Sequence, residues 1–85
     1  MWSVYVIQND LTQEIYMGVS SELKQRLSSH NAGDQVATRR KQGAWKLIYA
    51  EAFRVKDDAV RREHQLKHHG SAKQELLKRI KHSLL

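Results

Sequence analysis

A chain of 85 residues without cysteine is long enough for one small domain, and it excludes folds that depend on disulfides or on thiolate-bound zinc. Lysine and arginine number 15 against 9 acidic residues, and this net charge of +6 favours nucleic acid as a partner, with a generic basic surface as the alternative. No apolar run is long enough to span a membrane and the first residues lack a charged signal-peptide head, so we expect one cytoplasmic domain over residues 1–85 that contacts no membrane.

Two segments near the N-terminus have the composition of β-strands. Residues 2–7 and 14–19 are rich in β-branched and aromatic side chains, and turn-forming residues separate them. We predict a β-hairpin whose four-residue loop, Asn9 to Thr12, makes Tyr5 and Tyr16 direct cross-strand partners. The Cβ atoms of such partners lie roughly 5 Å apart, so two phenol groups would leave one face of the sheet together. Packing of two aromatic rings in a hairpin is the alternative.

The face that holds the tyrosines is opposite an apolar row, because side chains alternate along a strand. That row consists of Ile15, Met17 and Val19. Gly18 shares the tyrosine face and has no side chain, so it would leave space beside Tyr16 for a ligand. We therefore look for a functional site on the tyrosine face.

A helix is predicted directly after the hairpin. Residues 20–22 are two serines and a glutamate, the residue types that favour a helix N-terminus. The side chains that follow at helical spacing share one face: Leu23, Arg26, Leu27 and His30. A helix that only packed would place apolar residues there, so Arg26 and His30 are candidate functional residues.

Residues 31–44 are predicted to form a loop, because this segment contains two glycines and several polar residues. Three consecutive basic residues lie within it, Arg39, Arg40 and Lys41. Cations on such a segment can contact phosphates, which position a nucleic acid without reading its sequence. A solvated connection is the alternative.

A third strand is predicted from Trp45 to Phe53. Its alternation places Trp45, Leu47, Tyr49 and Phe53 on one face. Apolar residues on the other face indicate a central strand that is covered on both sides. Glu51 is either a second acidic group near the site or a solvated charge near a strand end.

A second helix is predicted to begin at residues 56–58, where two aspartates suit the positive end of the helix dipole. The spacing of Ala59, Glu63 and Leu66 puts all three on its packing face. A carboxylate there must be paired or bind a metal, because an unpaired buried charge destabilises the fold. A structural ion pair between Glu63 and Arg26 is the alternative, and it can coexist with a metal.

The C-terminal part is predicted to be helical as well. Three histidines, His64, His68 and His69, lie off the packing face, so we favour exposed basic residues over a zinc site. Gly70 is predicted to end the second helix, and residues 71–74 to form a capping box for the next one. The leucine stripe of this last helix indicates core packing, with a lid or a dimer contact as the alternatives.

The ordered set of motifs resembles the GIY-YIG nuclease superfamily, in particular its small single-domain bacterial members of uncharacterised function, the UPF0213-like group. The resemblance lies in Val4-Tyr5, Tyr16-Met17-Gly18, Arg26, Ser29 to Gly33, Thr38-Arg39, Leu47 to Glu51 and Arg61 to Lys67. It implies a GIY-YIG-like α+β fold, a small antiparallel sheet of at least three strands flanked by about three helices. We expect one such nuclease domain over residues 1–85.

The resemblance also implies a metal-dependent endonuclease that acts on DNA rather than RNA, in repair or turnover of nucleic acid. Branched, single-stranded and damaged DNA are the candidate substrates. Glu63 would hold one Mg²⁺ or Mn²⁺ ion, and Tyr5 or Tyr16, made more acidic by the cation and by Arg26, would deprotonate or orient the water. Arg26 would also stabilise the charge on the phosphorane, and His30 would orient a phosphate or a tyrosine.

The chain departs from some relatives at two positions. It has Val19 where some have a lysine, and it lacks an asparagine after Asn31 where some supply one near the C-terminus. These departures favour the alternative function, a non-catalytic nucleic-acid-binding module of the same fold. Specificity would then come from the basic surface, from an unusual nucleic-acid shape or from a protein partner. A protein-interaction adapter that uses the last helix is a third hypothesis.

Overall fold

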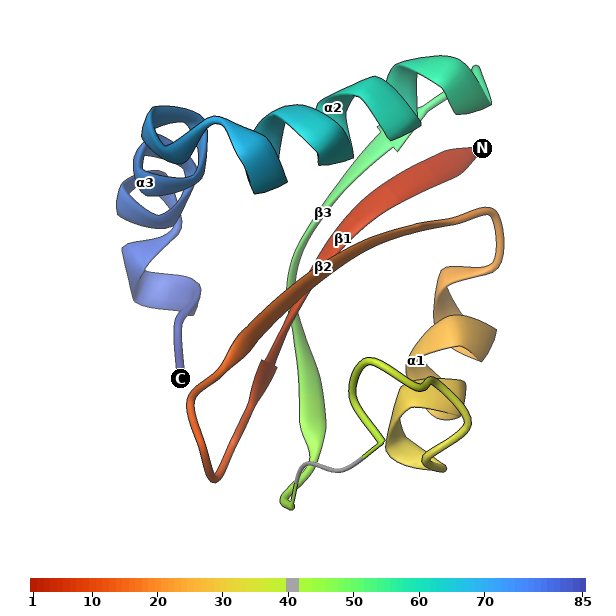
Figure 1. The fold of residues 1–85 in the computed structure, drawn as a ribbon, viewed down its shortest axis with the longest axis vertical. Coiled ribbons are helices and arrows are strands. Elements are labelled where there is room, and N and C mark those ends of the chain that lie inside the picture. The colour runs from red at the N-terminus through yellow and green to blue at the C-terminus, as the bar shows by residue number, and fades with distance from the viewer. Residues whose placement is uncertain (40–41) are drawn as a thin grey trace.

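The computed structural model describes residues 1–39 and 42–85 (Figure 1). It contains an antiparallel sheet of the three strands β1 (Trp2–Asn9), β2 (Ile15–Ser20) and β3 (Trp45–Phe53), in the order β2-β1-β3. The helical elements are α1 (Leu23–Asn31), α2 (Lys56–His68), α3 (Gly70–Arg79) and the 3₁₀ turn η1 (Lys81–Ser83). The predicted α+β fold is confirmed.

The hairpin prediction is confirmed in its strands and wrong in its register. β1 and β2 pair antiparallel, but Tyr5 lies opposite Gly18 rather than opposite Tyr16. The loop is displaced by one residue, because the Asn9 N–H donates to the Glu14 carbonyl at 2.9 Å and Asn9 Oδ1 accepts from the backbone of residues 11 and 12. The cross-strand partner of Tyr5 is therefore two positions further along β2 than predicted. Because side chains alternate with a period of two, both tyrosines stay on the predicted face and become diagonal neighbours.

β3 has the predicted bounds but not the predicted place in the sheet. It is an edge strand, and β1 is the central one. The register of β3 against β1 shifts between Leu47 and Tyr49, where Ile48 forms a β-bulge. The bulge reverses the alternation, so Trp45 packs on the tyrosine face while Tyr49 and Phe53 pack on the opposite face. The prediction that these residues share one face is wrong.

Two apolar clusters cover the two faces of the sheet. One joins the sheet to α2 and α3 through Val4, Val6, Met17, Ala59, Leu66 and Leu76. The other lies under α1 and contains Tyr5, Ile7 and Trp45, with Tyr16, Leu23 and Leu27 packed against it. The molecule therefore has three layers, with α1 on one side of the sheet and α3 on the other (Figure 1). Burial of Leu76 confirms the core interpretation of the last helix.

The helix boundaries differ from prediction at the C-terminal end. α2 begins at Lys56 as predicted, with Asp57 and Asp58 in its first turn. It ends at His68, and Gly70 is the first residue of α3 rather than the end of α2. The extended backbone of His69 makes this break, so no glycine is needed, and the predicted capping box is absent from α3. No helix within residues 1–39 and 42–85 is long and apolar enough to cross a membrane.

Candidate active site

Three aromatic rings gather on the tyrosine face of the sheet, beside α1. Tyr5 comes from β1, Tyr16 from β2 and His30 from the end of α1, and their ring centroids lie 5.1 to 6.4 Å apart. Tyr5 is 1% exposed and His30 is 3% exposed, whereas Tyr16 is partly exposed. Solvent therefore reaches Tyr16 more easily than the other two.

Gly18 has a different role from the predicted one. A Cβ atom at this position would lie 2.6 Å from Cζ of Tyr5 and closer still to its hydroxyl oxygen. Because Tyr5 lies opposite Gly18 in the hairpin, its ring fills the space that a side chain would need. The space that we predicted to be open for a ligand is occupied by the ring of Tyr5.

A chain of hydrogen bonds runs from Tyr5 into the loop after α1. The Thr38 hydroxyl donates to the Gln35 carbonyl at 3.4 Å, which leaves its oxygen to accept the Nδ1–H of His30 at 2.8 Å. Nε2 of His30 then accepts the hydroxyl proton of Tyr5, again at 2.8 Å. His30 is thus oriented as a neutral imidazole whose Nε2 accepts a hydrogen bond from Tyr5.

The pKa values of this pair follow from burial and from Arg26. Burial, with Tyr16 as the second cause, raises the pKa of Tyr5 to about 12, and the nearby Arg26 opposes the rise. Burial and then the charge of Arg26 lower the pKa of His30, which keeps the imidazole neutral at neutral pH. Without a bound cation, Tyr5 is thus less acidic than an ordinary tyrosine, and the predicted acidification requires added positive charge.

Glu63 reaches the same place from α2. Its charge is close enough to contribute to the raised pKa of Tyr5. One turn further on, Lys67 Nζ lies 3.6 Å from Glu63 Oε2 and 5.3 Å from the ring centroid of Tyr16. Glu63 therefore forms an ion pair with Lys67. Leu66, one residue earlier, packs into the opposite cluster, so α2 contributes side chains both to that cluster and to the site.

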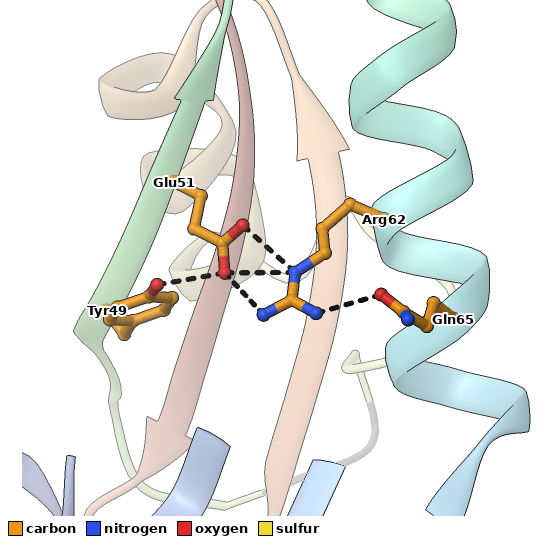
Figure 2. Close-up of polar contacts among 4 residues, drawn as sticks. All are labelled: Tyr49, Glu51, Arg62 and Gln65. Carbon is orange, nitrogen blue, oxygen red and sulfur yellow. Dashed lines mark hydrogen bonds and ion pairs between the residues drawn. The ribbon is translucent and has the colours of Figure 1, made fainter. Parts of the chain in front are cut away.

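Glu51 is neither a second acid of the site nor a solvated charge (Figure 2). Its carboxylate accepts Arg62 Nε at 3.0 and 3.1 Å, Arg62 Nη2 at 2.9 Å and the Tyr49 hydroxyl at 2.8 Å. Burial would raise the pKa of Glu51, but the Arg62 and Tyr49 bonds hold it below its ordinary value. Arg62 also donates to Gln65 Oε1 at 2.9 Å.

This Glu51–Arg62 clamp joins β3 to α2 through the residue directly before Glu63. Consecutive residues of a helix point about 100° apart, so holding Arg62 against β3 constrains the rotation of α2 about its axis and with it the direction of Glu63. Figure 2 shows the two side chains meeting between strand and helix. The clamp therefore influences how α2 is oriented at the site, although Glu51 and Arg62 are not site residues.

The basic loop residues are only partly described. Arg39 is exposed and follows Thr38, whose side chain contacts His30, so this part of the loop passes beside the site. Arg40 and Lys41, which we also predicted to bind nucleic acid, lie outside the described residues. A polar cavity of about 330 Å³ opens next to Arg26, lined by Gln25, Ser29 and Gln35 among others.

The side chains predicted for one site thus converge: Tyr5 bonds His30, Tyr16 packs against both, and Arg26 and Glu63 influence Tyr5 from two helices. Residues 1–80 match the profile described as the GIY-YIG catalytic domain. The chain belongs to the GIY-YIG family. This is a nuclease family, whose members act on nucleic acid and generally use divalent metal ions.

Relatives of this GIY-YIG chain cover most of its length. It is 36% identical over 78 residues to a UPF0213 protein of Halobacterium salinarum, which covers 91% of this chain and 99% of that one. It is 32% identical over 76 residues to a UPF0213 protein of Vibrio campbellii, covering 89% and 72%. The solution structure of a UPF0213 protein from Bacillus halodurans superposes with a TM-score of 0.56 at 28% identity, covering 95% and 86%.

The chemistry of the site fits a hard divalent ion that the GIY-YIG family implies. Within residues 1–39 and 42–85, no group of three His, Cys, Asp or Glu side chains could enclose a metal. A Mg²⁺ ion commonly keeps several waters and binds one or two carboxylates plus substrate phosphates. The Glu63 side chain, 24% exposed, is accessible to such an ion. His64 and His68, by contrast, stack on each other with centroids 4.2 Å apart.

Sequence reasoning assigned no role to two side chains at this GIY-YIG site. Thr38 lies in the loop after the first helix, where neither helical nor strand periodicity applies, so no local pattern links it to His30. Lys67 could have been noticed, because it stands four residues after Glu63 and so on the same helical face. Its proximity to Tyr16 depends on how α2 lies on the sheet.

Proposed function

We propose that this chain is a metal-dependent endonuclease that hydrolyses phosphodiester bonds in DNA rather than RNA, in repair or turnover of nucleic acid. The substrates we expect are branched, single-stranded or damaged DNA. The main support is the convergence of the Tyr5–His30 hydrogen bond, 2.8 Å long, with Arg26 and the accessible Glu63 carboxylate. The net charge of +6 suits a polyanionic substrate.

The first chemical requirement is a base for the attacking water. We assign this role to Tyr5, because Nε2 of His30 can accept its hydroxyl proton while the phenol oxygen takes one from the water. The resulting hydroxide bonds to phosphorus, the P–O bond to the leaving sugar oxygen breaks, and that oxygen takes a proton from solvent water. Tyr16, which is partly exposed, would orient the water from the next strand.

The second requirement is positive charge around the phosphate. Arg26 would bind a phosphoryl oxygen and favour the tyrosinate form of Tyr5, since its charge already opposes the raised pKa. Glu63 would hold Mg²⁺ or Mn²⁺, and such an ion supplies Lewis-acid stabilisation of the phosphoryl charge. The exposed Arg39 would contact phosphates beyond the scissile one, together with Arg40 and Lys41.

A non-catalytic nucleic-acid-binding module is the second candidate. The ammonium of Lys67 beside Glu63 favours it, because a cation of the protein already neutralises the carboxylate that would bind metal. A protein partner could direct either activity to a particular substrate, as base-specific contacts have no assigned residues here.

The test is cleavage of labelled single-stranded, duplex and branched DNA, and of RNA, with Mg²⁺, Mn²⁺ or a chelator. Wild type is compared with Glu63→Gln, which keeps the shape of the side chain, and with Glu75→Gln, an exposed glutamate on α3. We expect metal-dependent cutting of DNA by wild type and Glu75→Gln, and a rate lower by at least about a hundredfold in Glu63→Gln.

The other outcomes discriminate between the hypotheses. Binding without cutting by wild type would replace the nuclease by the binding module. Cutting of RNA alone would overturn the choice of DNA. Absence of any binding that weakens with added salt would leave the protein-interaction adapter.

A further inference from the structure

The ammonium group of Lys67 lies between two residues of the site that come from different elements. Its Nζ is 3.6 Å from Glu63 Oε2 and 5.3 Å from the centroid of Tyr16, on the edge strand β2. The side chain is 38% exposed, so solvent and a substrate can reach it. An ion pair and a cation–π contact therefore hold one accessible cation at the mouth of the site.

The simple interpretation is an ordinary ion pair along one helix, since Glu63 and Lys67 are four residues apart. Such exposed pairs stabilise helices only slightly and are easily exchanged for other partners. Weak attachment also means that the ammonium can leave Glu63 when a phosphate offers a stronger partner. The contact with Tyr16 distinguishes Lys67, because it aims the cation at the tyrosine pair rather than at bulk solvent.

The cations of the site come from opposite sides. Arg26 belongs to α1, whereas Lys67 belongs to α2, and each acts on a member of the tyrosine pair. A phosphodiester over the tyrosines would meet positive charge on both flanks. Val19, where some relatives have a lysine, packs with the opposite apolar cluster and supplies none.

We propose that Lys67 is a further catalytic residue, which neutralises Glu63 in the free protein and moves to a non-bridging phosphate oxygen when substrate binds. The movement would free the Glu63 carboxylate for a divalent ion at the moment the phosphate arrives. Lys67 thus competes with metal in the free protein and assists cleavage in the complex. The catalytic part of this inference rests on the proposed function.

The experiment compares wild type with Lys67→Met and Lys67→Arg, with Lys56→Met as the matched control. Lys56 lies on the same helix with its Nζ 5.0 Å from the centroid of Trp2, but it has no place in the site. Mn²⁺ binding to the free proteins is followed by electron paramagnetic resonance, and DNA cleavage is measured at saturating Mn²⁺. Oligonucleotide binding is measured over a range of salt concentrations.

We expect Lys67→Met to bind Mn²⁺ about twofold more tightly than wild type, because the competing ammonium is gone. At saturating metal it should nevertheless cut about ten to a hundred times more slowly. Its binding to the oligonucleotide should show a salt slope smaller by about one, the signature of one lost phosphate contact. Lys67→Arg should recover most of the rate, and Lys56→Met should match wild type in all three measurements.

The two proposals fail in different ways. Wild type that cuts no nucleic acid overturns the proposed function, whatever the variants do. If wild type cuts and Lys67→Met cuts equally fast, the catalytic role of Lys67 is refuted. Unchanged Mn²⁺ affinity together with an unchanged salt slope refutes the inference even in the absence of cleavage.

Discussion

Substitution of Gly18 by alanine should disturb the site through Tyr5. The new Cβ would lie 2.6 Å from Cζ and 2.9 Å from Cε1 of Tyr5, and closer still to the hydroxyl oxygen. Carbon atoms in contact are normally about 3.5–4.0 Å apart, so the ring must move by about 1 Å. The Tyr5 ring is buried between β2 and His30, so this movement breaks its 2.8 Å hydrogen bond to the imidazole.

The cost can be estimated from these two effects. Overpacking in a well-packed core costs about 1–3 kcal/mol, and the lost buried hydrogen bond adds about 1 kcal/mol. The free energy of unfolding should therefore fall by about 2–4 kcal/mol. In a chain of this size, each 1 kcal/mol shifts Tm by about 4–8 °C, so we expect Tm to drop by roughly 8–32 °C.

The assay is thermal and urea unfolding followed by circular dichroism. Gly70→Ala is the control, because this glycine begins α3 and no atom lies within 4 Å of its Cβ position. It should leave stability unchanged or raise it by up to about 1 kcal/mol. In a Tyr5→Leu background, which removes the atoms nearest the new Cβ, Gly18→Ala should cost much less than in wild type.

Two results would refute this reasoning. One is a Gly18→Ala protein as stable as the Gly70→Ala protein. The other is an unchanged cost of Gly18→Ala in the Tyr5→Leu background, which would mean that the clash is with something other than the phenol ring.

Three further predictions concern the hydrogen bonds around the site. The pKa of Tyr5 is about 12 in the folded protein and about 10 in the unfolded protein. Wild type should therefore lose about 3 kcal/mol of its free energy of unfolding as the pH rises from 10 through 12, because the unfolded state loses the phenol proton first. Urea unfolding of Tyr5→Phe should lack this loss. Glu51→Gln removes the charge from the clamp of Figure 2 and should cost about 1–3 kcal/mol, whereas Asp58→Asn, at an exposed ion pair, should change stability by less than about 1 kcal/mol in the same assay. Thr38→Val removes the acceptor of the His30 Nδ1–H, so nitrogen NMR of the imidazole should show a loss of the preference for that tautomer, and an unchanged spectrum would contradict the hydrogen-bond chain.

Several elements could be predicted from sequence because their signals are local. Alternation of apolar and polar residues marked β3 from Trp45 to Phe53, and the aspartates marked the start of α2. The period of two put Tyr5 and Tyr16 on one face even though the hairpin register was wrong, since an error of two positions leaves faces unchanged. Arg26 and His30, the polar residues on the apolar face of the first helix, lie close to Tyr5.

The sequence by itself therefore determined the strands and helices, the apolar faces of β1, β2 and α1, and the family. Tertiary structure alone decided which groups touch: the ring of Tyr5 over Gly18, the ion pair of Glu51 with Arg62 and the position of Lys67 beside Tyr16. The physical reason is that periodicity is a property of a few neighbouring residues, whereas these contacts depend on a loop displaced by one residue, a bulge at Ile48 and the way α2 packs on the sheet. Each is set by packing between segments far apart in the chain, which no local pattern records.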